Sequence, residues 1–335
     1  MGRRVVRELR RADRLLRARA QAVVTRGGRT ATVVGGGVIG LTCALELARA
    51  GHLVTVLSAD PAERTTSAVA AAIWFPYAAA PPGPVLRWSA ESAEVFADLA
   101  ANPDAGVSMR TGRLLERTES DRWWASAVTG LAEVPAAELP NGVTSAARVT
   151  VPIIDMGVYL GWLTAQCVSA GVRLSRTEVA DLAEVDGDLV VVAAGLRSRA
   201  LVGDDTLAPL RGQVVRLANP GLTDWVIDDD NPAGMTYVVP RFEDVVCGGT
   251  ADLGAFDTRV DPDVEHAILA RARALVPALR DAPILSRAVG LRPSRPEVRL
   301  EWLPGERPVI CCYGHGGAGV TMSWGCAREV ARLAG

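Results

Sequence analysis

The sequence contains no lysine, so every one of its 36 basic residues is arginine. This bias indicates GC-rich codon usage rather than a particular chemistry. Only three histidines are present, and the six cysteines form no CxxC pair, so spacing alone assembles no metal-ligand cluster. We therefore predict no metal site, and we expect reduced thiols in a cytoplasmic protein.

The sequence also lacks any run of about eighteen apolar residues free of charges or turn residues, so it predicts no membrane-spanning helix. Its 335 residues are 49% hydrophobic and 22% charged, which supplies a full core and excludes wholesale disorder. We expect one long domain or two interlocked ones.

The basic residues are concentrated at the start of the chain. Residues 1–29 contain ten Arg against Glu8 and Asp13, a charge of +8, which leaves −10 for the remainder because the total is −2. An acidic body argues against a nucleic-acid partner. Charges interrupt the segment too often for an export signal. An anionic surface and plain solvent are both open as its surroundings; we expect a solvated tail and no membrane partner.

The first regular elements form a βαβ unit. Thr30 to Val34 is a β-branched strand pattern, a helical pattern runs from Leu41 until Gly51, and Leu53 to Leu57 is a second strand. Two buried strands around one helix within about thirty residues are typical of a doubly wound sheet.

The turn between that strand and helix reads Gly35-Gly36-Gly37-Val38-Ile39-Gly40, which fits GxGxxG. Gly35 permits the tight turn, Gly37 lets a pyrophosphate approach the backbone, and Gly40 allows close helix–strand packing. The phosphates would lie at the helix N-terminus, where unpaired N–H groups favour anions. The pattern predicts a dinucleotide site over a merely structural turn, but it does not separate FAD from NAD.

A ribose-binding acid is expected at the end of the second strand. Ser58 occupies that position and Asp60 follows two residues later, so Asp60 is the candidate. A turn or N-cap role before Pro61 is the alternative.

The second half of the chain has a different pattern of predicted secondary structure. Short alternating strands are predicted at 213–217, 235–239, 245–248 and 284–291, with one helix at 261–276, which indicates an antiparallel sheet over a pocket. Further helices are predicted at 86–100, 159–171 and 319–333, and further strands at 107–115, 172–174, 189–192 and 309–313. The fold class is therefore α/β (α+β), a Rossmann-type dinucleotide domain (30–80, 150–210 and 300–335) interleaved with an antiparallel-sheet substrate domain (81–149 and 211–299).

Several separated motifs carry a resemblance to a known family. The stretch from Thr65 to Tyr77, TTSAVAAAIWFPY, resembles the D-amino-acid oxidase family, with its Thr-rich turn, Val-Ala-Ala segment and Trp-x-Pro-Tyr. The match continues in order through AAG at 193–195, RGQ at 211–213, GLRPSRP at 290–296 and YGHGGAG at 313–319.

The resemblance implies FAD as cofactor. It implies contacts to the phosphates and flavin from Thr65, Thr66, Ala71, Ala72 and Ile73, to adenine from Val179, at a second turn from Gly195, and beside the flavin pyrimidine from Gly317, Gly319, Val320 and Thr321. Independently, the N-terminus of a helix beginning at Gly319 would stabilise negative charge on a reduced flavin. A plain strand-to-helix turn is the alternative for this glycine-rich run.

The resemblance also implies a substrate site. Arg292 would bind the substrate carboxylate, for which a permanently charged, two-pronged guanidinium is suited. Without the resemblance, Arg295 would be almost as good a candidate. Tyr237 would add its hydroxyl, unless it is a core aromatic residue, and the Gly317 carbonyl would accept from the amine. Tyr77 is included as a further substrate contact.

The implied activity is oxidation of a D-amino acid, with hydride passing from the α-carbon to flavin N5 and O2 giving hydrogen peroxide. Because orientation supplies much of the catalysis, no acid–base residue is expected. The loop at 228–234, DDDNPAG, lacks the aromatic residue often contributed by family members. Its acids favour neutral or basic substrates over acidic ones, although we expect these carboxylates to be simply solvated. A glycine- or sarcosine-type oxidase, a D-aspartate oxidase and a non-catalytic flavoprotein are the alternatives, and a homodimer is one option for the assembly.

Overall fold

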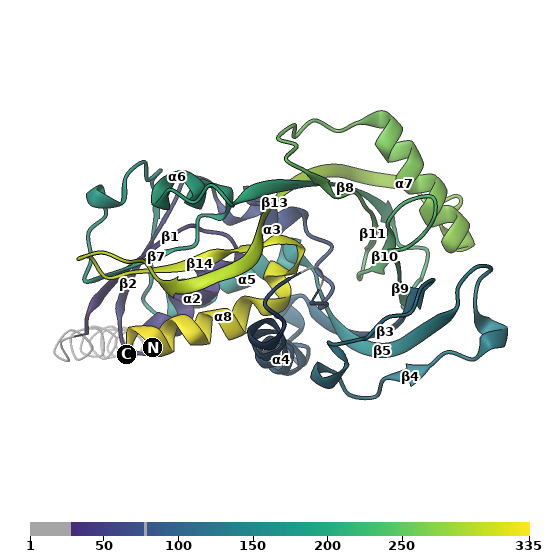
Figure 1. Ribbon diagram of the computed structural model, residues 1–335, viewed down its shortest axis with the longest axis horizontal. Helices are drawn as coiled ribbons and strands as arrows, with labels where there is room; N and C mark the ends of the chain where they lie inside the picture. Colours follow the sequence, from purple (N-terminus) through teal and green to yellow (C-terminus); the bar gives the residue numbers. More distant parts are fainter. Residues whose placement is uncertain (1–27, 77–78) are drawn as a thin grey trace, which may run out of the picture.

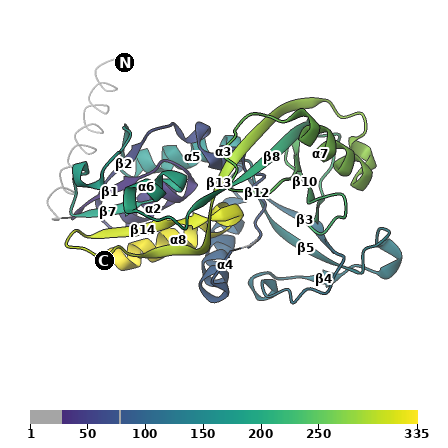
Figure 2. The ribbon, with the colours of Figure 1, turned by 45° about the horizontal axis from the view of Figure 1, so that its top comes forward.

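The computed structural model describes residues 28–76 and 79–335, so the Arg-rich segment 1–27 and the predicted substrate contact Tyr77 lie outside the described residues. Within them, one fourteen-stranded sheet runs through the whole molecule (Figure 1). The sheet has a parallel part and a largely antiparallel part, which form the two lobes seen in Figure 1 and, turned by 45°, in Figure 2.

The parallel part contains five strands. They follow one another as β6 (Arg173–Arg176), β2 (Leu53–Ser58), β1 (Thr30–Val34), β7 (Leu189–Val192) and β14 (Val309–His315). All four residues of β7 are buried, as expected for a parallel strand covered on both faces. Helix α2 (Val38–Arg49) packs against both α5 (Met156–Ser169) and α8 (Gly319–Ala334).

The remaining strands extend the sheet beyond β14. In spatial order they are β13 (Ile284–Trp302), β8 (Ala208–Ala218), β11 (Asp244–Gly248), β10 (Thr236–Pro240), β9 (Trp225–Asp228), β3 (Val107–Glu116), β5 (Ser145–Ile154) and β4 (Ala132–Glu133), with β12 (Asp252–Leu253) paired to β8. Helix α7 (Pro262–Leu275) packs on β8, β10 and β11, and α4 (Pro82–Leu99) packs on α8. Short helices α3 (Thr66–Val69) and α6 (Ser198–Val202) complete the described helices.

The long strand β13 joins the two parts. Its first half pairs with β8 and its second half with β14, both antiparallel. The sequence pattern predicts a strand only as far as Leu291, because Pro293 and Pro296 normally end a central strand. The structure continues the strand to Trp302 because a register irregularity between Ser294 and Arg299 accommodates the interruption.

The other predicted elements are present with shifted ends. The βαβ unit and the antiparallel sheet are confirmed, and so is the interleaving, since β14 and α8 return to the parallel part. Helix α4 starts four residues earlier than predicted, at Pro82, where proline fits the first helical turn. Strands β5 and β9 were not predicted. The numerical domain bounds stay a prediction, because one continuous sheet crosses them.

No helix among the described residues is long and apolar enough to cross a membrane.

The contact between α4 and α8 depends on Gly325. A Cβ added there would lie 2.2 Å from the Trp88 carbonyl oxygen, and the Gly325 N–H donates to the buried Ser92 hydroxyl at 2.9 Å. The interface therefore excludes any side chain at this position.

We expect Gly325→Ala to lower the free energy of unfolding by about 1–3 kcal/mol or more, because backbone must move to admit the methyl group. Denaturant unfolding measures it. Gly161→Ala is the control: nothing lies within 4 Å of a Cβ at this site in α5, so it should be neutral or stabilising by up to ~1 kcal/mol. Equal effects of the two changes would contradict this account.

Candidate active site

A cavity of about 660 Å³ lies where the parallel part of the sheet meets the antiparallel part. Its walls come from the glycine turn after β1, the segment 65–75, strand β13 and the turn between β14 and α8. Segments separated by almost the whole chain thus enclose one space.

One end of the cavity is the glycine turn. Gly35 has φ +124°, and a Cβ there would lie 2.2 Å from the Ala193 carbonyl oxygen, so only glycine fits. A Cβ on Gly40 would lie 1.9 Å from the Gly35 carbonyl oxygen, which confirms that α2 packs close to the strand. Gly37, the N-cap residue of α2, has no side chain to cap the helix, and the Val38 N–H donates to the Ser67 hydroxyl, so the N–H groups that follow Val38 are the ones available to an anion.

The predicted ribose-binding acid lies at the same end. Asp60 lines the cavity, and its carboxylate is 3.5 Å from the Arg197 guanidinium. Ser58, which occupies the end of β2, also lines the cavity, but its hydroxyl donates to the Asp60 carbonyl oxygen at 2.6 Å and is therefore already engaged.

The segment 65–75 is tied to three different walls. The Thr66 hydroxyl donates to the Leu291 carbonyl, next to Arg292, and the Ser67 hydroxyl accepts from the Val38 N–H at 3.0 Å. The Thr321 hydroxyl donates to the Phe75 carbonyl and accepts from the Phe75 N–H. These bonds make the segment a fixed wall of the cavity, and they show that Thr321 already uses its side chain within the protein.

A further wall is formed by the glycine-rich turn that starts α8. Gly317, Gly319, Val320 and Thr321 all line the cavity, and the N-cap residue Ala318 makes no side-chain cap. Two helix N-termini therefore lie on the wall of one cavity, which suits a ligand with anionic phosphates and a ring that becomes negative on reduction. The residues present fit FAD.

Arg292 enters the cavity from β13. Gly212, on the neighbouring strand β8, pairs with Gly290 of β13. A Cβ on Gly212 would lie 2.4 Å from the Arg292 guanidinium. The missing side chain of Gly212 is therefore the space that the guanidinium fills. The Arg292 Nη1 donates to the Thr250 carbonyl at 2.9 Å, which holds the group in place.

Tyr237 lines the same cavity as Arg292. Its ring covers Gly248 and Gly249, where a Cβ would lie 2.1 Å and 2.6 Å from ring atoms. Burial raises the pKa of Tyr237, so its hydroxyl stays protonated and can donate to a carboxylate.

Arg295 has a different location. It does not line the cavity, and its Nε donates to the buried Asp204 carboxylate at 2.9 Å. Asp204 also accepts from Tyr313 and Arg299, so Arg295 belongs to a structural ion-pair cluster. Of the two arginines in GLRPSRP, Arg292 is the one in the cavity.

The acidic loop is not simply solvated, contrary to expectation. Asp228 is fully buried and bonded to Arg117, and Asp230 is exposed, but Asp229 lines the cavity with Arg292 and Tyr237. Burial, together with the neighbouring Asp230 and Asp228, raises the pKa of Asp229 to about 6, although Arg292 opposes the shift. The site thus contains a carboxylate that sequence reasoning assigned to solvent.

The structure collects most of the predicted site residues around this one space. Gly40 packs behind the glycine turn and is not among the lining residues, and Tyr77 lies outside the described part of the chain. Sequence reasoning missed Ser67 and Thr258 as lining residues, and it missed the structural role of Gly212. The residues that both the sequence predicted and the structure places on the cavity wall are Gly35, Gly37, Val38, Ile39, Asp60, Thr65, Thr66, Ala71, Ala72, Ile73, Val179, Gly195, Tyr237, Arg292, Gly317, Gly319, Val320 and Thr321.

This fold and cavity define a flavin-dependent oxidoreductase, and residues 30–333 match the family described as FAD dependent oxidoreductase. Among solved structures, glycine oxidase from Geobacillus kaustophilus superposes with a TM-score of 0.78 at 22% identity, covering 91% of this chain and 94% of that one. At that identity the likeness shows the fold alone.

Relatives with similar sequences identify the family more specifically. The chain is 48% identical over 311 residues to a D-amino-acid oxidase of Rubrobacter xylanophilus, covering 91% of this chain and 95% of that protein. It is 45% identical to a D-amino-acid oxidase of Streptomyces coelicolor, covering 90% and 95%, and 35% identical to human D-aspartate oxidase, covering 90% and 93%. The chain belongs to the D-amino-acid oxidase family.

We expect Gly212→Ala to displace the Arg292 guanidinium while leaving the backbone in place, because the new methyl group meets only the end of a long side chain. The KM for a D-amino acid should rise roughly tenfold, equivalent to about 1.4 kcal/mol. Steady-state kinetics with the FAD absorbance as a folding check measure the effect, with Gly161→Ala as control. An unchanged KM would show that Arg292 does not need this space.

Proposed function

We propose that this chain oxidises neutral and basic D-amino acids, with FAD as cofactor and O2 as the second substrate. The observation that supports this most is that Arg292 and Tyr237 line one cavity together with the N-terminus of α2 and its GxGxxG turn. Membership of the D-amino-acid oxidase family supplies the reaction class.

Arg292 and Tyr237 bind the substrate carboxylate. The guanidinium can donate two parallel hydrogen bonds to a carboxylate, while the phenol donates a third. The Thr250 carbonyl accepts a hydrogen bond from Nη1, and the absence of a side chain on Gly212 leaves space for the guanidinium. The guanidinium is therefore held in place before substrate arrives, which lowers the entropic cost of binding.

The Gly317 carbonyl, at the start of the turn before α8, accepts from the substrate amine. Three fixed points of attachment define which hydrogen on the α-carbon faces the ring, so they select one enantiomer. The wall residues supply orientation and exclude water, and no side chain is required to act as an acid or base. FAD held at this site would supply the hydride acceptor, with O2 as the final oxidant and hydrogen peroxide as its product, while the released imino acid would hydrolyse to a 2-oxo acid and ammonia.

Asp229 sets the side-chain preference. A carboxylate on the cavity wall repels a second substrate carboxylate and attracts a cationic side chain. This charge disfavours D-aspartate and D-glutamate. The human relative is named D-aspartate oxidase, so the two proteins would differ in side-chain preference. A glycine-type oxidase, the activity named for the fold neighbour, would not need a charged group in this position.

The direct test is peroxide release by the FAD-loaded protein with a panel of D- and L-amino acids. We expect peroxide only with D-enantiomers. Arg292→Gln should reduce kcat/KM by ~100-fold or more, since hydrogen bonds to charged groups contribute about 1.5–3 kcal/mol each. Arg295→Gln is the matched control and should leave KM unchanged while lowering thermal stability, because it loosens the Asp204 cluster. Bound FAD without peroxide from any D-amino acid would indicate a non-catalytic flavoprotein.

Asp229→Asn should change specificity rather than rate. At pH 8 we expect kcat/KM for D-glutamate to rise about tenfold, the equivalent of ~1.4 kcal/mol of relieved repulsion, with D-methionine little affected and D-arginine reduced.

The pH dependence follows from the same carboxyl group. Its pKa is raised to about 6, so Asp229 is neutral below that pH and charged above it. The preference of the unmodified protein for D-methionine over D-glutamate should therefore increase as pH rises through about 6, and Asp229→Asn should abolish this increase. A preference that is flat with pH in both proteins would remove Asp229 from the specificity account.

A further inference from the structure

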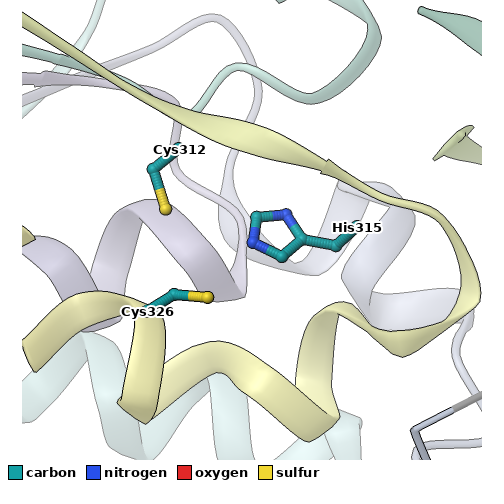
Figure 3. A group of neighbouring side chains, drawn as sticks. All are labelled: Cys312, His315 and Cys326. Carbon is teal, nitrogen blue, oxygen red and sulfur yellow. The ribbon is translucent and has the colours of Figure 1, made fainter. Parts of the chain in front are cut away.

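A buried cluster of two cysteines and one histidine lies at the wall of the cavity. Cys312 and His315 come from β14 and Cys326 from α8, and the donor atoms of the three side chains all lie within 4.8 Å of one another. Figure 3 shows the two sulfur atoms and one ring nitrogen directed toward a common point. The proposed oxidation uses none of these three side chains as an acid, base or nucleophile.

The histidine in this cluster lacks a hydrogen-bond partner. His315 is 3% exposed, and its Nε2, the nitrogen that faces the sulfur atoms in Figure 3, is buried without a partner among the described residues. An unsatisfied buried nitrogen costs free energy, so its orientation toward two thiols calls for a physical reason. A bound cation at the common point would supply the missing interaction.

We propose that Cys312, His315 and Cys326 bind one zinc ion. Two thiolates would neutralise the 2+ charge in a buried position, and thiolate with imidazole is a ligand set that zinc favours over hard cations such as Mg²⁺.

The geometry is close to that of a zinc site. With Zn–S of about 2.3 Å and Zn–N of about 2.0–2.1 Å, donor atoms in a tetrahedral site lie roughly 3.4–3.8 Å apart. The observed upper limit of 4.8 Å therefore requires a contraction of at most about 1.0–1.4 Å, which side-chain rotations can supply.

A fourth donor is nearby. The fully buried Cys43 thiol, on α2, lies outside the group of three donors that are within 4.8 Å of one another, so it would have to move closer to bind the same ion. Without that movement, water would take the fourth position of a tetrahedral site. Cys312 and His315 also line the cavity.

The position of the cluster defines what the ion does. Cys312 and His315 precede the glycine-rich turn at 316–319 and Cys326 follows it, so a bound ion would brace both sides of the turn that forms the flavin end of the cavity. An ion that binds only the folded chain stabilises it in proportion to its occupancy.

The experiment uses the full-length FAD-loaded protein, first stripped with a chelator and then titrated with Zn²⁺, Cd²⁺ or Mg²⁺. We expect one equivalent of zinc by elemental analysis, a cadmium–thiolate charge-transfer band at one equivalent, and a rise in Tm of a few degrees. Mg²⁺ should produce neither binding nor a change in Tm.

Cys326→Ala tests the assignment, because Cys326 does not line the cavity and its loss leaves the flavin and substrate contacts in place. It should abolish the cadmium band and the zinc-dependent rise in Tm. Cys247→Ala is the matched control, a fully buried thiol on β11 outside the cluster, and should keep both.

A second measurement covers the case in which Cys326→Ala does not fold. Crystals of the zinc-treated protein should show anomalous scattering at the zinc edge between Cys312, His315 and Cys326. Anomalous density elsewhere, no tight equivalent of zinc, or a disulfide between Cys312 and Cys326 in the purified protein would overturn the proposal. None of these results depends on whether the protein oxidises D-amino acids.

Discussion

The placement of one guanidinium against one glycine is the constraint on which the active site depends. Arg292 occupies the space that a side chain on Gly212 would fill, and Tyr237 covers Gly248 and Gly249 in the same way. The strand that carries Arg292 is shared by both parts of the sheet, so the charge is held at their junction. The long Arg292 side chain is thereby preorganised to bind a carboxylate, because packing and the hydrogen bond to the Thr250 carbonyl exclude its other conformations.

Charge is distributed along the cavity in a way that matches the proposed chemistry. The N-termini of α2 and α8 line the cavity and would provide positive potential for the phosphates and the flavin, and Arg292 would provide it for the substrate carboxylate. Asp229 is the negative exception. Burial raises its pKa to about 6 although Arg292 opposes the shift, and its position on the cavity wall underlies the preference for neutral and basic side chains that we propose.

Local patterns carried most of the correct predictions. The βαβ unit, the glycine turn and the strand-to-helix turn at Gly319 depend on residues close in sequence, and they appear where predicted. Predictions were less accurate where tertiary pairing overrides local preference. Strand β13 continues past two prolines because β8 and β14 pair with it on either side. The expectation that the acidic loop is solvated was wrong, because folding turns Asp229 inward while Asp230 stays exposed.

The sequence by itself determined the class of fold, the dinucleotide turn and the family, since each depends on residue types at fixed short spacings. The tertiary structure decided which of Arg292 and Arg295 faces the cavity, because both lie on one strand and only their partners, Gly212 and Asp204, distinguish them. It also decided that Cys312, His315 and Cys326 meet. Spacing could not show that cluster, because the third donor approaches from a helix whose packing angle no local pattern encodes.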